Sequence, residues 1–430
     1  MKAASHFAHF PSRRTFVTVL FLLAFVVRLG AVLALRNIHE FHGRSPGGAD
    51  AVEYNEIALS LAAGDGYSVT PGLLTSFRPP GLPFFLSLVY RISYENYELA
   101  YLSFIALGAL TCVFTYYLAR EVLSESWARA AGLLSAIYFP HVYVSTLFLS
   151  EVLFTFCLAL ALWLLLVYFR KPSVWLMVGS GLCLGYAALT RPIGVLMPVF
   201  LLPALVRSTG WRPRALLRCA LPFGLAAVAV VIPWTLRNYS VNHHLVLLTT
   251  NGGSTFYGSN NDVTLHERRF LGSWISTVYL PGRPAIDATP DEYSHDRMEW
   301  KLGEEWVEGH IVDMPLLTFY KIARFWLPDW SSPNFKFDVL ELVGYTPVAL
   351  LILLGLFVAL RPIRKALAPA WLALHGILAA NLLSTIVFYG SARFRDSIAP
   401  VLMVYAALGL QAIVGWWQRR RLGTVAERAA

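Results

Sequence analysis

The chain carries little charge for its length. Of its 430 residues, 57% are hydrophobic and 14% are charged, whereas an ordinary soluble domain carries about 25% charged residues. Apolar runs of roughly twenty residues recur along most of the sequence, which is the length that a helix needs to cross a bilayer. The scarcity of charge therefore excludes an ordinary soluble protein and predicts an all-α polytopic membrane protein.

Cysteine is also scarce, and no internal repeat of fixed period is visible. The four cysteines lie in or beside apolar runs, with no CxxC or other metal-ligand spacing: Cys112, Cys157, Cys183 and Cys219. We expect these thiols to pack as small hydrophobic groups. The lack of a repeat argues against a transporter built from inverted repeats.

The formal net charge of +9 does not indicate a nucleic-acid partner, because the basic residues lie mainly in short loops beside apolar runs. Such loops stay on the cytoplasmic side of a membrane. Their positions predict an inner-membrane protein with both termini in the cytoplasm and the first apolar run retained as an anchor. We expect about ten transmembrane helices, at residues 15–36, 98–120, 128–147, 150–169, 174–190, 193–207, 215–235, 340–360, 367–389 and 397–417.

This topology places two long segments of the single membrane domain (residues 1–430) outside the cytoplasm. The first, residues 37–97, contains a helix-period apolar stripe that ends at Gly64-Asp-Gly66, then a Pro-Pro turn and a second apolar run. We expect two amphipathic helices there, lying along the membrane surface. The second, residues 238–333, is predicted to be a small folded module with helices at 292–311 and 316–326 and an aromatic core. The predicted core residues are Trp274, Trp300, Trp306, Phe319 and Tyr320.

The unusual polar residues all fall on the external side in this topology, although hydropathy alone placed the spans. They occur in both long segments and at the external ends of spans: Asp50, Glu53, Arg78, Ser150, Glu151, Arg191, the run 251–261 that ends in Asn260 and Asn261, Arg393, Arg395 and Asp396. Because these residues all fall on the same side of the membrane, we expect them to belong to a common site.

Each of these residues also has a purely structural interpretation. Asp50 is suited to cap a helix, and Glu151 is a first-turn acid that a helix dipole favours. External arginines can anchor a span at the interface. The Asn-rich run 251–261 is typical of a turn, but its amides equally suit sugar hydroxyls. However, Glu151 lies where a span enters lipid, and charges there are costly and usually functional. External arginines also run against the positive-inside bias, which favours an anionic partner.

An external carboxylate together with several external arginines indicates one type of chemistry. The carboxylate can accept a proton from an acceptor hydroxyl as a general base. Arginines can bind a phosphate through paired hydrogen bonds and stabilise it as it leaves. The pattern predicts glycosyl transfer from a lipid-phosphate sugar, with inversion of the anomeric centre because one base drives a single displacement.

The chain resembles the GT-C superfamily of integral membrane glycosyltransferases, in the family 39-like branch of protein O-mannosyltransferases and lipid A aminoarabinose transferases. The resemblance is carried by an ordered set of motifs: Asp50 and Tyr54 with the stripe to Gly64-Asp-Gly-Tyr67, Arg78-Pro-Pro-Gly-Leu-Pro83, Ser150-Glu151, Thr190-Arg191-Pro192, and Arg393-Phe-Arg395 with Pro400.

The resemblance implies that Asp50 is the catalytic base and that Glu151 is a second acid of the site, with a divalent metal as a possible link between them. It implies that Arg78, Arg191, Arg393 and Arg395 contact the donor phosphate. We also expect Glu53, Tyr54, Asn260 and Asn261 to bind substrate. The donor is expected to be a polyprenyl-phosphate sugar, and the acceptor a glycan, lipid or protein.

The first external segment departs from the eukaryotic protein mannosyltransferases, because Asp50 follows Ala49 and is not part of an Asp-Glu pair. Two other functions remain open from the sequence. A transporter or flippase for lipid-linked sugars also needs external arginines. An O-antigen ligase or polymerase also has many spans and a large external loop.

Overall fold

The computed structural model describes residues 12–39, 48–93, 96–328 and 335–429. Across these ranges the chain is helical, and its only β-type pairing is an isolated bridge between Ser68 and Leu74. This confirms the all-α prediction. Three of the cysteines are buried and Cys183 is half-buried, and all four are free thiols, as expected.

Seven helices in the described part of the chain are long and apolar enough to cross a membrane. They are α1 (Arg13–His39), α4 (Tyr97–Arg120), α7 (Glu151–Arg170), α10 (Pro213–Asn242), α16 (Phe335–Ala359), α18 (Pro369–Val387) and α20 (Ala399–Ala429). The protein is therefore an integral membrane protein. Shorter apolar helices include α8 (Val174–Thr190) and the pair η2 (Pro192–Val195) and α9 (Met197–Ser208), so the predicted count of about ten is not confirmed.

The prediction of one continuous span at 128–147 is wrong. The helix α5 (Glu125–Ile137) is followed by Tyr138, whose backbone is extended, and α6 (Phe139–Val144) begins at the next residue. Pro140 has no backbone N–H and its ring would clash with the carbonyl of Ala136 in a continuous helix. Hydropathy continues through this break, which is why it predicted a single span.

Glycines allow two pairs of apolar helices to approach closely. On α8, a Cβ at Gly185 would lie 2.6 Å from the carbonyl oxygen of Ala227 on α10. On α16, a Cβ at Gly355 would collide with the carbonyl of Tyr405 on α20, where Gly409 faces Leu351 in return. Small residues at helix crossings are typical of membrane proteins, in which backbone packing replaces the hydrophobic effect between helices.

The first long segment (residues 37–97) contains two short helices, α2 (Gly48–Ala63) and α3 (Gly81–Ser93). The predicted stripe holds, because α2 buries Tyr54, Ile57 and Ala58. The helix stops at the Gly-Asp-Gly sequence, where Gly64 has φ +96° and Gly66 has φ +92°, a left-handed conformation that glycine adopts without steric cost. Both predicted helices are therefore present.

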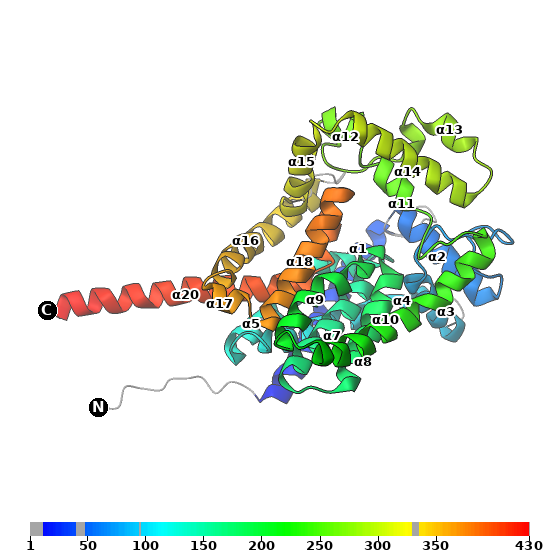
Figure 1. The fold of residues 1–430 in the computed structure, drawn as a ribbon. Coiled ribbons are helices and arrows are strands. Elements are labelled where there is room, and N and C mark those ends of the chain that lie inside the picture. Colours follow the sequence, from blue (N-terminus) through cyan, green and yellow to red (C-terminus); the bar gives the residue numbers. More distant parts are fainter. Residues whose placement is uncertain (1–11, 40–47, 94–95, 329–334, 430) are drawn as a thin grey trace.

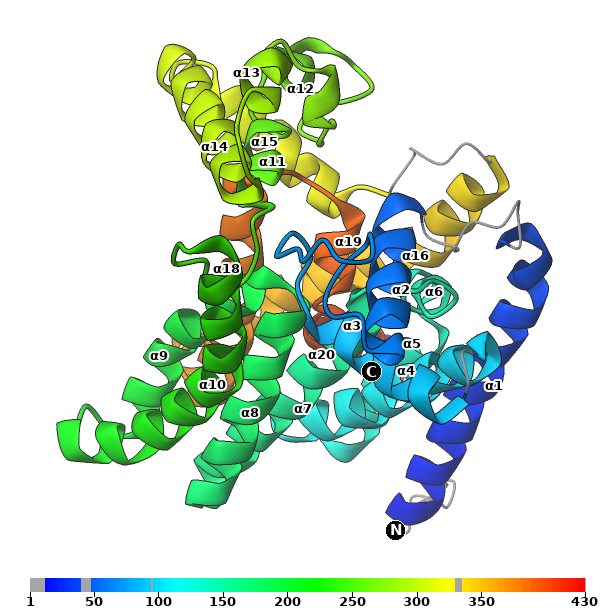
Figure 2. The ribbon, with the colours of Figure 1, turned by 90° about the vertical axis from the view of Figure 1, so that its right-hand side faces the viewer.

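The second long segment (residues 238–333) contains a group of short helices at one end of the bundle (Figures 1 and 2). These helices are α11 (Gly252–Tyr257), α12 (Asp262–His266), η3 (Thr277–Tyr279), α13 (Arg283–Asp287), α14 (Glu292–Gly309) and α15 (Met314–Trp326). The helices α14 and α15 occur where they were predicted. The predicted aromatic core is wrong: Tyr257, Leu280 and Ile286 form the core, while Trp274 is 37% and Phe319 is 64% exposed.

The two long segments are joined to each other and to α10. Glu292 at the start of α14 accepts hydrogen bonds from Thr75 Oγ1 (2.6 Å) and from the Ser76 amide (2.8 Å). From α10, Arg237 donates to the Thr75 carbonyl (2.7 Å) and to Ser76 Oγ (3.0 Å). The loop that leads to Arg78 is thus held between α10 and α14.

Candidate active site

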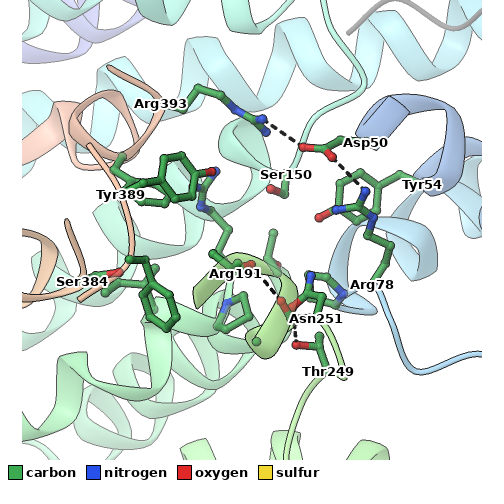
Figure 3. Close-up of a pocket in the computed structure, with 18 residues that line it drawn as sticks. Asp50, Tyr54, Arg78, Ser150, Arg191, Thr249, Asn251, Ser384, Tyr389 and Arg393 are labelled. Atoms are coloured by element: carbon green, nitrogen blue, oxygen red, sulfur yellow. Dashed lines mark hydrogen bonds and ion pairs between the residues drawn. The ribbon is translucent and has the colours of Figure 1, made fainter. Parts of the chain in front are cut away.

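A cavity of about 200 Å³ lies between α2, α11 and the ends of α7, α8 and α18 (Figure 3). Its lining comes from six separate stretches of the chain. These are Asp50 and Tyr54 on α2, Arg78 and Pro79, Ser150, residues 190–193 after α8, Thr249 to Thr255 with α11, and residues 384–394 from α18 to the short helix α19 (Ala392–Asp396). The structure thus brings together residues from most of the sequence motifs.

Asp50 lies in the first turn of α2, between two arginines. Its Oδ1 is 2.9 Å from Arg78 Nη2, and its Oδ2 is 2.9 Å from Arg393 Nη1. Burial raises the pKa of Asp50, but the guanidinium groups of Arg393 and Arg78 outweigh it and hold that pKa below its ordinary value. Asp50 is therefore an ionised carboxylate at neutral pH, and 32% of its side chain remains accessible.

Glu151 begins α7 and is almost fully buried, with 1% exposure. Its Oε1 accepts from Arg393 Nε (2.6 Å) and Arg191 Nη1 (2.6 Å), while its Oε2 has no partner among the described residues. Glu151 does not line the cavity. The structure places this acid behind the arginines, where it orients them.

Glu53 and Tyr54 both lie beside Arg78. Glu53 Oε2 is 2.6 Å from Arg78 Nε, and the Arg78 guanidinium lies 5.7 Å from the centre of the Tyr54 ring. Tyr54 lines the cavity and Glu53 does not. Burial raises the pKa of Tyr54 to about 12, so this phenol keeps its proton.

Six charged residues form what we call the cavity cluster: Asp50, Glu53, Glu151, Arg78, Arg191 and Arg393. The three positive and three negative charges balance, but they are unevenly placed. All three arginines line the cavity, whereas Asp50 is the one member carboxylate that does so. The cluster therefore presents mainly guanidinium groups to the cavity, an arrangement suited to an anion such as phosphate.

Arg395 does not line the cavity, contrary to the expectation that it contacts the donor phosphate. It is fully buried, and its guanidinium contacts Asp396 (2.9 Å), Glu341 on α16 (2.9 Å) and the Leu327 carbonyl (3.1 Å). Residues two apart in a helix point in nearly opposite directions, because each residue turns by about 100°. Arg395 therefore anchors α19 while Arg393 reaches the cavity.

Asn260 and Asn261 also lie away from the cavity. Both are buried; Asn260 Oδ1 accepts from Lys321 Nζ (2.7 Å), and Asn261 caps α12. From the same Asn-rich run, Asn251 lines the cavity instead. Sequence reasoning also missed Thr249, Ser384, Phe388 and Tyr389, and it included Thr255 only as part of the run 251–261. The polar composition of 251–261 was the signal for this region, but it did not indicate which amide faces the cavity.

The residues of the cavity cluster do not fit a divalent cation in this arrangement. Both oxygens of Asp50 and one oxygen of Glu151 are engaged by guanidinium groups, which leaves Glu151 Oε2 as the single free oxygen of the two acids. The described residues contain no group of three or more His, Cys, Asp or Glu side chains with metal-binding geometry. A cation would have to displace Arg393 from both acids, so we derive no step through a metal.

Comparisons with known proteins agree with this architecture. The model of the dolichyl-phosphate-mannose-protein mannosyltransferase family matches residues 77–236. No curated protein matches the chain. Among solved structures, the Archaeoglobus fulgidus oligosaccharyltransferase in complex with Zn and sulfate superposes with a TM-score of 0.56 at 16% identity, covering 96% of this chain and 51% of that one.

A second structure, the archaeal oligosaccharyltransferase AglB from the same organism with an inhibitory peptide and a dolichol-phosphate, has a TM-score of 0.54 at 15% identity and covers 97% of this chain and 52% of that one. ArnT from Cupriavidus metallidurans bound to undecaprenyl phosphate has a TM-score of 0.46 at 15% identity, with 93% and 78% covered. The chain spans about half the length of the oligosaccharyltransferases. The chain therefore shares the fold of these oligosaccharyltransferases, and its residues 77–236 match the mannosyltransferase family model, in agreement with the resemblance seen in the sequence.

Proposed function

We propose that this protein is an inverting glycosyltransferase, which moves a sugar from a polyprenyl-phosphate donor to an acceptor hydroxyl on the extracytoplasmic face of the membrane. One observation carries the proposal: an ionised carboxylate, Asp50, shares a cavity wall with three arginines. A base and an anion-binding group side by side are what glycosyl transfer from a phosphate requires.

Donor binding begins the reaction. The phosphate oxygens accept hydrogen bonds from Arg78, Arg191 and Arg393, which line the cavity. As the phosphate neutralises these guanidinium groups, the influence that lowers the pKa of Asp50 weakens. Binding of the donor therefore makes Asp50 a stronger base at the moment when the donor is in place.

Transfer is then a single displacement. Asp50 accepts the proton of the acceptor hydroxyl while that oxygen attacks the anomeric carbon, and the bond from this carbon to the phosphate oxygen breaks on the opposite face. The electron pair stays with the lipid phosphate, whose growing charge the arginines stabilise. Attack opposite the leaving group inverts the anomeric centre.

The buried acids act as positioning residues in this mechanism. Glu151 holds Arg191 and Arg393 through one oxygen, and Glu53 holds Arg78. Without these carboxylates, the three guanidinium groups would repel one another and separate. We therefore assign Glu151 a role in keeping the phosphate site assembled.

The topology of the helices supports the external location of the cavity. The cavity lies at the start of α7 and just after the end of α8. The connection at the other ends of these helices contains Arg170 and Lys171, and basic residues of short loops remain in the cytoplasm. The segments 37–97 and 238–333 would then both be external, with both termini inside.

The test is the transfer of radiolabelled sugar from undecaprenyl-phosphate glucose or undecaprenyl-phosphate mannose by purified protein in nanodiscs. We expect Asp50→Asn to lose about 10²- to 10⁴-fold in rate, the usual contribution of a general base, while it still binds the donor. Normal transfer by Asp50→Asn would refute the mechanism. Donor binding without turnover by the wild type, with water or any acceptor, would instead favour a carrier of lipid-linked sugars.

A further inference from the structure

The cavity has a second wall, opposite in character to the cavity cluster. Its side chains come from residues 249–255 and from the end of α18, and none of them is charged. We call the residues Thr249, Asn251, Thr255, Ser384 and Phe388 the uncharged wall. The proposed transfer reaction assigns no role to this wall.

The polar atoms of the uncharged wall are held in place by local hydrogen bonds. Thr249 Oγ1 donates to Asn251 Oδ1 (2.8 Å), and the Asn251 carbonyl accepts from both the amide (3.1 Å) and the hydroxyl (2.8 Å) of Thr255. These bonds fix the Asn251 side chain, whose amide nitrogen donates to no residue that the structure describes. A fixed amide donor flanked by two hydroxyls suits a ligand that carries hydroxyl groups.

Phe388 adds an aromatic surface that is supported from behind. Phe256 and Trp300 stack with ring centres 4.7 Å apart, and Phe388 packs edge-on against both, at 6.4 and 6.2 Å. Three rings in mutual contact restrict the rotation of Phe388. The apolar C–H face of a sugar ring can pack on such a surface while its hydroxyls reach the amide and the threonines.

Three charged side chains that lie close to the elements of this wall are turned away from the cavity. Glu292 accepts from Thr75 and Ser76, the buried Asp296 accepts from the Gly253 amide (2.6 Å), and Lys321 donates to Asn260 and to the Ile386 carbonyl. None of the three lines the cavity. A carboxylate or ammonium group held against the uncharged wall itself, and not against the arginines or Asp50 of the cavity cluster, would therefore lose its hydration without gaining a partner of opposite charge, which is unfavourable.

We propose that the uncharged wall is a subsite for a neutral saccharide, recognised through hydroxyl contacts to Asn251, Thr249 and Thr255 and by packing on Phe388. The saccharide is either the acceptor or the sugar of the donor, and its role rests on the glycosyl transfer proposed above. In both cases the subsite selects against a carboxylate or an ammonium group on the sugar.

Binding is measured without turnover, by saturation-transfer difference NMR on the wild type in nanodiscs. The probes are methyl glucoside, methyl glucuronide and methyl glucosaminide, of which the last two add a carboxylate or an ammonium group. We expect methyl glucoside to bind and the charged probes to bind more weakly. Asn251→Ala should weaken methyl glucoside binding about tenfold, the scale of a lost hydrogen bond. Phe388→Ala should weaken it by a similar factor of about ten, because the packing of the sugar on the ring is lost.

Ser254→Ala is the matched control, because Ser254 lies on α11, directly after its N-cap Asn251 and the glycines Gly252 and Gly253, but does not line the cavity. It should bind methyl glucoside as the wild type does. Thermal unfolding of each variant separates lost binding from lost fold. The proposal is overturned if wild type does not bind methyl glucoside, if a charged probe binds equally well, or if Ser254→Ala loses as much as Asn251→Ala.

Addition of undecaprenyl-phosphate glucose distinguishes the two sources of the sugar. Displacement of methyl glucoside assigns the wall to the donor sugar, and simultaneous binding assigns it to the acceptor. Hydrolysis of this donor by wild type tests the proposed function separately. Saccharide binding without hydrolysis or transfer would refute the proposed glycosyl transfer and support the subsite. Hydrolysis without saccharide binding would support the glycosyl transfer and refute the subsite.

Discussion

Two groups of arginines and carboxylates in this protein lie on opposite sides of the helix α19. The cavity cluster contains Arg393, and what we call the buried cluster contains Arg395, Asp396, Glu341, Tyr138 and Tyr345. In the buried cluster, Arg395 is fully buried, with its guanidinium 3.5 Å from the centre of the Tyr345 ring. In the cavity cluster, 38% of the Arg393 side chain is accessible.

The same chemistry therefore has different consequences in the two places. In the buried cluster, Tyr138 and Arg395 both bond to Asp396, and none of these groups faces the cavity. Each acid that Arg393 contacts has a second arginine, Arg78 for Asp50 and Arg191 for Glu151. A substrate can thus replace a contact in the cavity cluster, whereas a lost contact in the buried cluster leaves a buried charge unpaired.

The largest expected contrast between the clusters is in stability. Arg395→Met should lower the free energy of unfolding by about 3–5 kcal/mol, because it removes the guanidinium that pairs with the buried carboxylate of Asp396. Unfolding in detergent, followed by tryptophan fluorescence, measures this loss. The matched variant Arg393→Met should lose clearly less, since Asp50 and Glu151 each keep another arginine. Equal losses would show that the two clusters do not differ in this way.

The next contrast is in donor affinity. Arg191→Gln should weaken the binding of undecaprenyl phosphate by about 10- to 100-fold, the scale of a lost hydrogen bond to a charged group. Binding is measured by native mass spectrometry or by microscale thermophoresis. The conservative variant Arg395→Lys should bind the lipid normally once folded. An Arg191→Gln protein with unchanged affinity would remove this arginine from the phosphate site.

The smallest expected effect is a shift in the pH dependence of the rate. Arg393 and Arg78 together hold the pKa of Asp50 below its ordinary value despite burial. Arg78→Gln removes one of these cations, so the pKa of Asp50 should rise. Because the base must be ionised, kcat/KM should then begin to fall at a higher pH than in the wild type as the solution is acidified.

Arg91→Gln is the control for this pH profile, since Arg91 lies on α3 and donates to the Leu61 carbonyl far from the cavity lining. Its acid limb should coincide with that of the wild type. If Arg78→Gln also leaves the acid limb of the profile unchanged, Arg78 does not lower the pKa of Asp50. The proposal that a bound phosphate makes Asp50 a stronger base by neutralising these arginines then fails.

Some features of the candidate site could be predicted because they depend on local sequence. The stripe on α2 and the stop at Gly64 follow from periodicity and from the backbone freedom of glycine. Hydropathy placed Asp50, Glu151 and Arg191 near the same membrane face, and the structure brings their side chains into one charge network. The break at Tyr138 was not predicted, because a proline inside an apolar run leaves hydropathy unchanged.

The sequence by itself determined that this protein is a helical membrane protein, and it indicated an external acid with external arginines, because burial cost and charge bias act on composition. Only the tertiary structure decided that Arg393 reaches the cavity and Arg395 does not, and that Asn251 lines it in place of Asn260. Within a short helix or loop, neighbouring residues have similar composition and point in different directions. Their roles depend on which distant helices pack against each face, and no local pattern records that.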